Sequence, residues 1–116
     1  DLQDRHVQFF KGKSLDHTCP MGPVIVTADE VGDLASLTIE TRVNGEVRQS
    51  ASLSEMIFDV PTLIAVLSDG MTLEPGDILA TGTPAGVGAA TGAYLKRGDV
   101  VDVTIRGIGT LTTYIV

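Results

Sequence analysis

An Asn-Gly pair at residues 44–45 constrains this sequence more than any other feature, because it lies between two segments in which apolar and polar residues alternate. Residues 37–43 alternate with a period of two, which is typical of a strand with one buried face. A two-residue turn of type I′ needs a positive φ at both central positions, and Asn-Gly meets that need at low steric cost. The pattern therefore predicts an antiparallel hairpin over residues 37–50 that turns at residues 44–45.

One helix is predicted after this hairpin, over residues 61–69, because the apolar period changes there from 2 to 3.6. Asp59 is the expected N-cap, Pro61 falls in the first turn, and Gly70 is expected to end the helix. The apolar side chains at helical spacing are predicted to be core. They are Met56, Ile57, Val60, Leu63, Ile64 and Leu67.

The remaining elements are short strands and turns. Strands are expected at 24–27, 78–80, 100–105 and 110–116, where β-branched or apolar residues gather. Turns are expected at 74–77 and 97–99, residues 29–36 are expected to form a polar loop, and residues 1–23 are expected to be irregular. The sequence thus predicts a single β-rich α+β domain over residues 1–116, with one helix on antiparallel strands.

Charge and composition argue against several classes of partner. The 116 residues carry 15 acidic and 8 scattered basic side chains, a formal net charge of −7, which disfavours nucleic acid and anionic membrane surfaces. No apolar run is long enough for a spanning helix, and the first residues show no signal peptide. A single cysteine, Cys19, cannot form an internal disulfide and favours a reducing cytoplasmic location.

The glycine-rich stretch at residues 80–92, ATGTPAGVGAATG, is the first candidate site. It lacks the closing Lys-Ser/Thr of a P-loop. Two interpretations are open: a flexible surface loop, or a loop that binds a substrate carboxylate through Thr81, Thr83 and backbone amides.

A second candidate is Lys11-Gly12-Lys13-Ser14, which is either a solvated turn or a loop with one lysine turned inward to neutralise an enolate or carboxylate. His17 and Cys19 are too few for a zinc site, which needs about four ligands. No nucleophile elbow of the form G-x-S-x-G occurs.

Seven short motifs occur in a fixed order along the sequence. They are Asp1-Leu2-Gln3, Gly12-Lys13-Ser14, Cys19-Pro20, Arg42-Val43-Asn44-Gly45, Met56-Ile57-Phe58, Met71-Thr72-Leu73-Glu74-Pro75-Gly76-Asp77 and Thr81-Gly82-Thr83-Pro84-Ala85-Gly86-Val87-Gly88. Together they make the sequence resemble the fumarylacetoacetate hydrolase family from Asp1 to Val116. The nearest branch resembles bacterial 2-hydroxyhepta-2,4-diene-1,7-dioate isomerases, decarboxylases and acylpyruvate hydrolases of aromatic catabolism.

The resemblance implies a mixed β-sandwich roll, a homodimer, and a divalent ion (Mg²⁺, Mn²⁺ or Ca²⁺) that helps to stabilise an enolate of a small 2-oxo acid. It implies that Gln3 contacts the substrate and that Lys13 is the active-site lysine. It further implies that Thr83 binds the substrate carboxylate, with Thr81 beside it and Gly82 forming the approach.

The resemblance also implies that the metal ligands are missing from this sequence. The family's Glu-x-Glu pair, a further aspartate and the His-Glu dyad of its hydrolases would precede Asp1, and His17 stands where a threonine is common. The chain is therefore expected to be the C-terminal portion of a catalytic domain. The alternatives to an enzyme are a non-catalytic β-module that binds an anionic metabolite and a dimerisation half.

Overall fold

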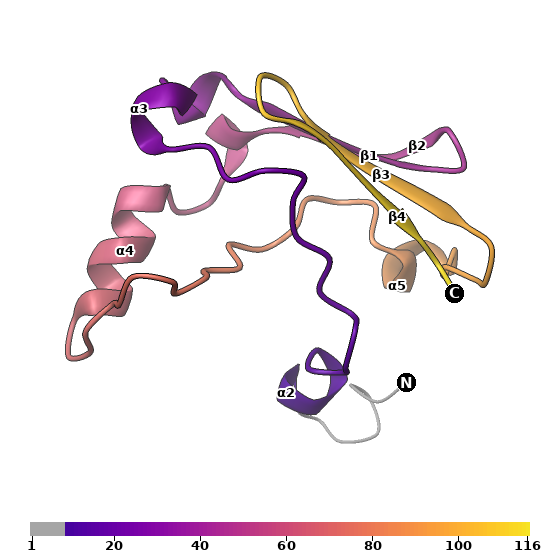
Figure 1. The fold of residues 1–116 in the computed structure, drawn as a ribbon, viewed down its shortest axis with the longest axis horizontal. Coiled ribbons are helices and arrows are strands. Elements are labelled where there is room, and N and C mark those ends of the chain that lie inside the picture. Colours follow the sequence, from indigo (N-terminus) through magenta and orange to yellow (C-terminus); the bar gives the residue numbers. More distant parts are fainter. Residues whose placement is uncertain (1–8) are drawn as a thin grey trace.

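A four-stranded antiparallel sheet organises the part of the chain that the structure, a computed structural model, describes: residues 9–116 (Figure 1). The strands are β1 (Thr38–Val43), β2 (Glu46–Ser52), β3 (Val100–Ile105) and β4 (Gly109–Tyr114). Their order in the sheet is β2-β1-β3-β4. The two central strands are thus far apart in the sequence, and the sheet joins the β1–β2 hairpin to the β3–β4 hairpin near the C-terminus.

Within residues 9–116, four α-helices accompany the sheet, and three of them are single turns. They are α2 (Phe9–Gly12), α3 (Ala28–Val31), α4 (Val60–Ser68) and α5 (Gly88–Thr91), with 3-10 turns η1 at Leu34–Ser36 and η2 at Leu53–Glu55. The longest, α4, begins as predicted: the Asp59 side chain accepts a hydrogen bond from the Thr62 amide at 2.9 Å, and Pro61 lies in the first turn. The predicted β-rich α+β fold with one main helix is confirmed.

The predicted hairpin is also confirmed, because Asn44 and Gly45 connect β1 to β2 with φ of 51° and 83°. The register is regular from Thr38↔Ser52 to Thr41↔Gln49, and then Arg42 pairs with Val47. Arg48 is therefore an extra residue, a β-bulge that resets which side chains of β2 face each side of the sheet. The sequence alternation alone did not predict this bulge.

Asn44 also ties the hairpin turn to the start of β3. Its side-chain amide donates to Asp99 Oδ1 at 3.0 Å and its oxygen accepts from the Val100 amide at 2.9 Å. Asp99 also accepts from the Lys96 amide and is the one buried residue of the described chain. The hydrogen bond from Asn44, followed by that from Lys96, lowers the pKa of the Asp99 carboxyl. The expected turns at 97–99 and 74–77 are both present.

Two predicted strands are absent. Residues 24–27 and 78–80 form no strand with any other described segment. Their β-branched and apolar side chains favour extended backbone, but they do not supply a partner strand. Ile25 and Ile78 are 96% and 69% exposed. The expectation of a loop at residues 29–36 was wrong in part, because this segment contains η1 and most of α3. The Asp33 side chain caps η1, and the Thr27 carbonyl accepts the first hydrogen bonds of α3. A turn of helix, α2, likewise falls inside the expected irregular segment.

The described residues enclose no buried apolar core. Leu63 and Leu67 are half-buried, whereas Ile57 and Ile64, also expected in the core, are 92% and 44% exposed. The physical reason is visible in Figure 1, where α4 lies to one side of the sheet instead of across its face. The accessible surface is 9211 Å², against roughly 6,000 Å² for a compact monomer of this mass.

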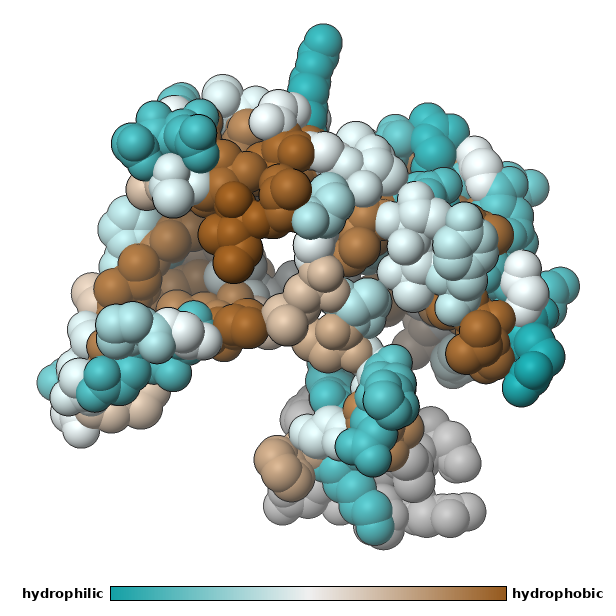
Figure 2. Space-filling view, viewed as in Figure 1, coloured by the Kyte–Doolittle hydropathy of each residue, from teal (hydrophilic) through white to brown (hydrophobic). Residues whose placement is uncertain are grey.

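Apolar side chains consequently remain on the surface, and the brown areas of Figure 2 show them gathered around the hollow between the sheet and α4. No helix within residues 9–116 is both long and apolar enough to cross a membrane.

Candidate functional site

The glycine-rich loop at residues 80–92 is attached to strand β2. In Figure 1 the segment after α4 crosses beneath the sheet and ends in α5. The Gln49 side-chain amide nitrogen donates to Thr83 Oγ1 and to the Pro84 carbonyl oxygen, both at 2.9 Å. One side chain of the sheet therefore holds two consecutive residues of the loop.

Gly86 allows the backbones of loop and strand to meet. A Cβ atom at this position would overlap the Arg48 carbonyl oxygen and would lie 3.1 Å from the Arg48 carbonyl carbon and from Gln49 Cγ. The residue also has a φ of 104°, in the region that favours glycine. The loop thus contacts the sheet at the bulge itself, between Arg48 and Gln49.

Gln49 lies on the apolar face of the sheet. Its register partner on β1 is Thr41, and Thr41 is in turn opposite Val103 on β3. A neighbouring pair on the same face is Ile39 of β1 with Ile105 of β3. Directly opposite residues in antiparallel strands share a face. A polar side chain among these residues needs hydrogen-bond partners, and the loop supplies two.

The three predicted loop residues lie at this attachment, and one of them, Thr83, is part of it. Thr81, Gly82 and Thr83 are consecutive and exposed. Gly82 has a φ of 105°, and a Cβ there would meet nothing within 4 Å. The loop therefore carries two exposed threonines around an uncrowded glycine, and the Thr83 hydroxyl oxygen is one of the two atoms that Gln49 holds.

The second candidate does not share this attachment. Lys13 follows α2, is exposed, and its backbone amide donates to the Phe10 carbonyl at 3.2 Å. Figure 1 shows α2 well away from the sheet, at the end of the extended segment that leads to α3. Gln3 lies outside the described residues. The structure thus brings the loop residues together without joining α2 to them.

Metal-ligating residues do not cluster in the described chain. No group of three or more His, Cys, Asp or Glu side chains within residues 9–116 could hold a metal ion. His17 and Cys19 are exposed, and His17 adopts a φ of 61° in a turn. These residues therefore do not fit the ligand set of a divalent ion.

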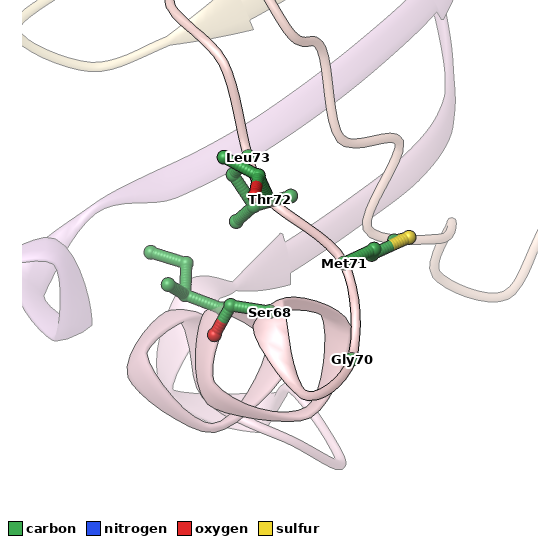
Figure 3. A pocket seen from close by; sticks show the side chains of 6 residues that line it. Ser68, Gly70, Met71, Thr72 and Leu73 are labelled. Carbon is green, nitrogen blue, oxygen red and sulfur yellow. The ribbon is translucent and has the colours of Figure 1, made fainter.

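A hollow at the C-terminal end of α4 carries little chemistry. Its lining residues are Ile64, Ser68, Gly70, Met71, Thr72 and Leu73, and Figure 3 shows it between the last turn of the helix and the segment that follows. The lining has no charged side chain and includes none of the predicted site residues. The loop attached to β2 is the stronger candidate.

Sequence reasoning missed Gln49. The one available signal was a polar side chain in a strand with an apolar face, but the face of Gln49 depends on the bulge at Arg48. Its partners are 34 and 35 residues away in the sequence, so no local pattern reports the contact.

Comparisons with known proteins agree with the resemblance noted in the sequence. Oxaloacetate tautomerase YisK of Bacillus subtilis (strain 168) is 59% identical over 117 residues, covering 99% of this chain and 39% of that protein.

A fumarylacetoacetate hydrolase from psychrophilic Exiguobacterium antarcticum has a TM-score of 0.94 at 58% identity, covering 99% of this chain and 42% of its own. Maleylpyruvate hydrolase from Sphingobium sp. SYK-6, in complex with manganese (II) ion and pyruvate, has a TM-score of 0.82 at 41% identity, covering 90% of this chain and 38% of its own. The chain thus spans about two fifths of the length of these relatives. The family model described as "Fumarylacetoacetate (FAA) hydrolase C-terminal" matches residues 1–116, and the chain belongs to the fumarylacetoacetate hydrolase family.

Proposed function

We propose that this chain is the C-terminal part of a divalent-metal-dependent enzyme that acts on small 2-oxo acids. The reaction is C–C bond hydrolysis, decarboxylation or isomerisation, which share an enolate. The observation that carries the proposal is the attachment of the Thr-Gly-Thr loop to β2, which favours a formed binding loop over a flexible surface turn. Two of the relatives named above are an oxaloacetate tautomerase and a maleylpyruvate hydrolase, and the structure of the second contains pyruvate, so 2-oxo carboxylates are common to these two.

The loop's role is to bind the substrate carboxylate. A carboxylate accepts hydrogen bonds and donates none when ionised, so its partners must be donors. The hydroxyl groups of Thr83 and Thr81 and the backbone amides around Gly82 are such donors. The three residues are exposed, and nothing lies within 4 Å of where a Cβ of Gly82 would be. Gly82 lets the backbone approach the ligand because it has no Cβ.

Lys13 and Gln3 are proposed as the remaining functional residues of this chain. An ammonium group near the reacting atoms would stabilise negative charge as it develops in the transition state. Gln3 is proposed to contact the substrate. With Lys13 on the segment after α2, this arrangement requires that α2 and the Thr-Gly-Thr loop face one substrate in the whole enzyme.

The metal ion is proposed to be bound outside the described residues, because these contain no suitable carboxylate cluster. The manganese complex of a relative supports a divalent ion, and we propose Mg²⁺, with Mn²⁺ or Ca²⁺ as substitutes. When bound, such an ion acts as a Lewis acid on the oxygen atoms of the substrate.

We propose that the enzyme is a cytoplasmic homodimer. The accessible surface is well above that of a compact monomer, so the exposed apolar side chains require cover from the remainder of a longer chain and from a second copy. The single cysteine, Cys19, is unpaired and exposed, which suits a reducing compartment.

The proposal is tested by assaying the protein at its natural length against acylpyruvates, oxaloacetate and a hydroxymuconate-type diene-dioate, with Mg²⁺ and with EDTA. We expect turnover of at least one substrate that EDTA abolishes and Mg²⁺ restores. Binding of pyruvate without any turnover would instead support a non-catalytic module. Turnover unchanged by EDTA would contradict the proposed metal dependence.

A further inference from the structure

We infer that Gln49 is a positioning residue that commits the Thr83 hydroxyl to donate its proton toward the bound anion. This inference rests on the proposed function of the Thr-Gly-Thr loop and adds a residue to it. Gln49 lies on β2, more than thirty residues before the loop that it holds.

The two contacts of Gln49 determine how its amide group is oriented. The Pro84 carbonyl oxygen can only accept a hydrogen bond, so the atom 2.9 Å from it must be the amide nitrogen. The same nitrogen lies 2.9 Å from Thr83 Oγ1 and carries two hydrogen atoms. Gln49 therefore donates to both partners at once.

This orientation decides the direction of the hydrogen bond at Thr83. A threonine hydroxyl has one proton to donate and two lone pairs with which to accept. Because Gln49 occupies one lone pair, the proton of the hydroxyl remains available for another acceptor. Thr83 is exposed, so a ligand from solvent has access to it, and the substrate carboxylate is proposed as the acceptor.

The backbone supports the same arrangement. The bulge at Arg48 sets Gln49 in register with Thr41, on the apolar face that the loop approaches. Gly86 brings the loop into contact with the Arg48 carbonyl, where any larger residue would overlap it. β-Bulges often re-aim a side chain next to an active site, and here the bulge aims Gln49 at Thr83.

Gln49→Glu tests the inference in the protein at its natural length. The substitution preserves the size of the side chain but replaces the donor with a carboxylate that can only accept. Thr83 would then donate to the new carboxylate, and its proton would be lost to the substrate. We expect KM for a 2-oxo carboxylate to rise roughly ten- to a hundred-fold while kcat changes little, since one hydrogen bond to a charged group is lost.

A double-mutant cycle separates positioning from general damage. In a Thr83→Val background, Gln49→Glu should add little further increase in KM, because the hydroxyl that it redirects is gone. Ser50→Ala, on the opposite face of the same strand, is the matched control and should leave KM unchanged. Equal melting temperatures of the variants would exclude a loss of folded protein.

The outcomes distinguish the two proposals. If Thr83→Val leaves KM unchanged, the proposed role of the loop fails. If Thr83→Val raises KM but Gln49→Glu does not, or if the two effects multiply independently, Gln49 does not act through Thr83 and the inference is overturned. If Gln49→Glu unfolds the protein, Gln49→Met provides the second test: it also cannot donate, and it should raise KM in the wild-type background only.

Discussion

Gly86→Ala should destabilise the protein more than alanine does at two other glycines with the same backbone geometry. Gly86, Gly82 and Gly76 have φ of 104°, 105° and 103°, so alanine incurs comparable backbone strain at each, about 1–2 kcal/mol. They differ in what a Cβ would meet. At Gly82 and Gly76 nothing lies within 4 Å, whereas at Gly86 the Cβ would overlap the Arg48 carbonyl oxygen.

The additional cost at Gly86 follows from the contacts that hold the loop. Relief of the overlap requires the loop to move away from Arg48, and the adjacent hydrogen bonds from Gln49 to Thr83 and Pro84 would then break. Each such bond contributes about 0.5–1.5 kcal/mol. Gly86→Ala should therefore lose roughly 1–3 kcal/mol more than either control, on the same basis.

Urea denaturation of the protein at its natural length, followed by circular dichroism, measures this difference. Stability losses can be compared through the midpoints provided that the slope m is the same for the three variants. If Gly86→Ala costs no more than Gly82→Ala and Gly76→Ala, the loop is not packed on β2 in the folded protein, and the described attachment is refuted.

Three further predictions concern the lysines, the buried carboxylate and the isolated chain. In steady-state kinetics, Lys13→Met should lower kcat by about 10²–10³ and Lys11→Met should change it little; equal effects would favour an ordinary turn. Asn44→Ala should raise the pKa of Asp99 toward its ordinary value of 3.8, because the bond from Asn44 is the largest cause of the lowered pKa. A carboxyl group whose pKa is lowered on folding stabilises the folded state at pH values above its ordinary pKa, and this stabilisation is lost as the pH falls through the lowered pKa. Asn44→Ala should therefore lose less stability than the wild type over that acidic pH range. NMR titration of the Asp99 carboxyl carbon measures the pKa, and an unchanged titration would contradict the assignment. The 116-residue chain expressed alone should show no metal-dependent turnover and poor solubility, because β2 and β4 are sheet edges and residues 9–116 enclose no apolar core. Robust activity of a soluble 116-residue chain would contradict this prediction.

The hairpin and the main helix could be predicted because their signals are local. Asn44 and Gly45 themselves adopt the positive φ angles that the turn requires, and Asp59 caps a helix that begins one residue later. Residues 24–27 and 78–80 were mispredicted because a strand needs a partner, and β-branched composition does not report whether one exists. The exposure of Ile57 and Ile64 has a similar cause, since helical spacing identifies an apolar face without showing what covers it.

The candidate site was only partly accessible from the sequence. The Thr-Gly-Thr loop was indicated by its glycines and by the family resemblance, but neither showed that the loop is held in place. That depends on Gln49, whose direction is set by a one-residue bulge at Arg48 and whose partner Thr83 is 34 residues away. Contacts of this kind arise from tertiary structure and leave no periodic pattern.

Kinetics of Thr83→Val on a 2-oxo carboxylate and on its ester or amide analogue test most directly whether this loop binds the substrate carboxylate. Valine is close to threonine in size, so the hydroxyl is removed while packing is retained. We predict that KM for the carboxylate rises by about ten- to a hundred-fold with kcat nearly unchanged, and that the neutral analogue is affected much less. An equal rise in KM for both substrates, or no change in KM for either, would contradict the account. Residues 80–92 would then be interpreted as a surface loop.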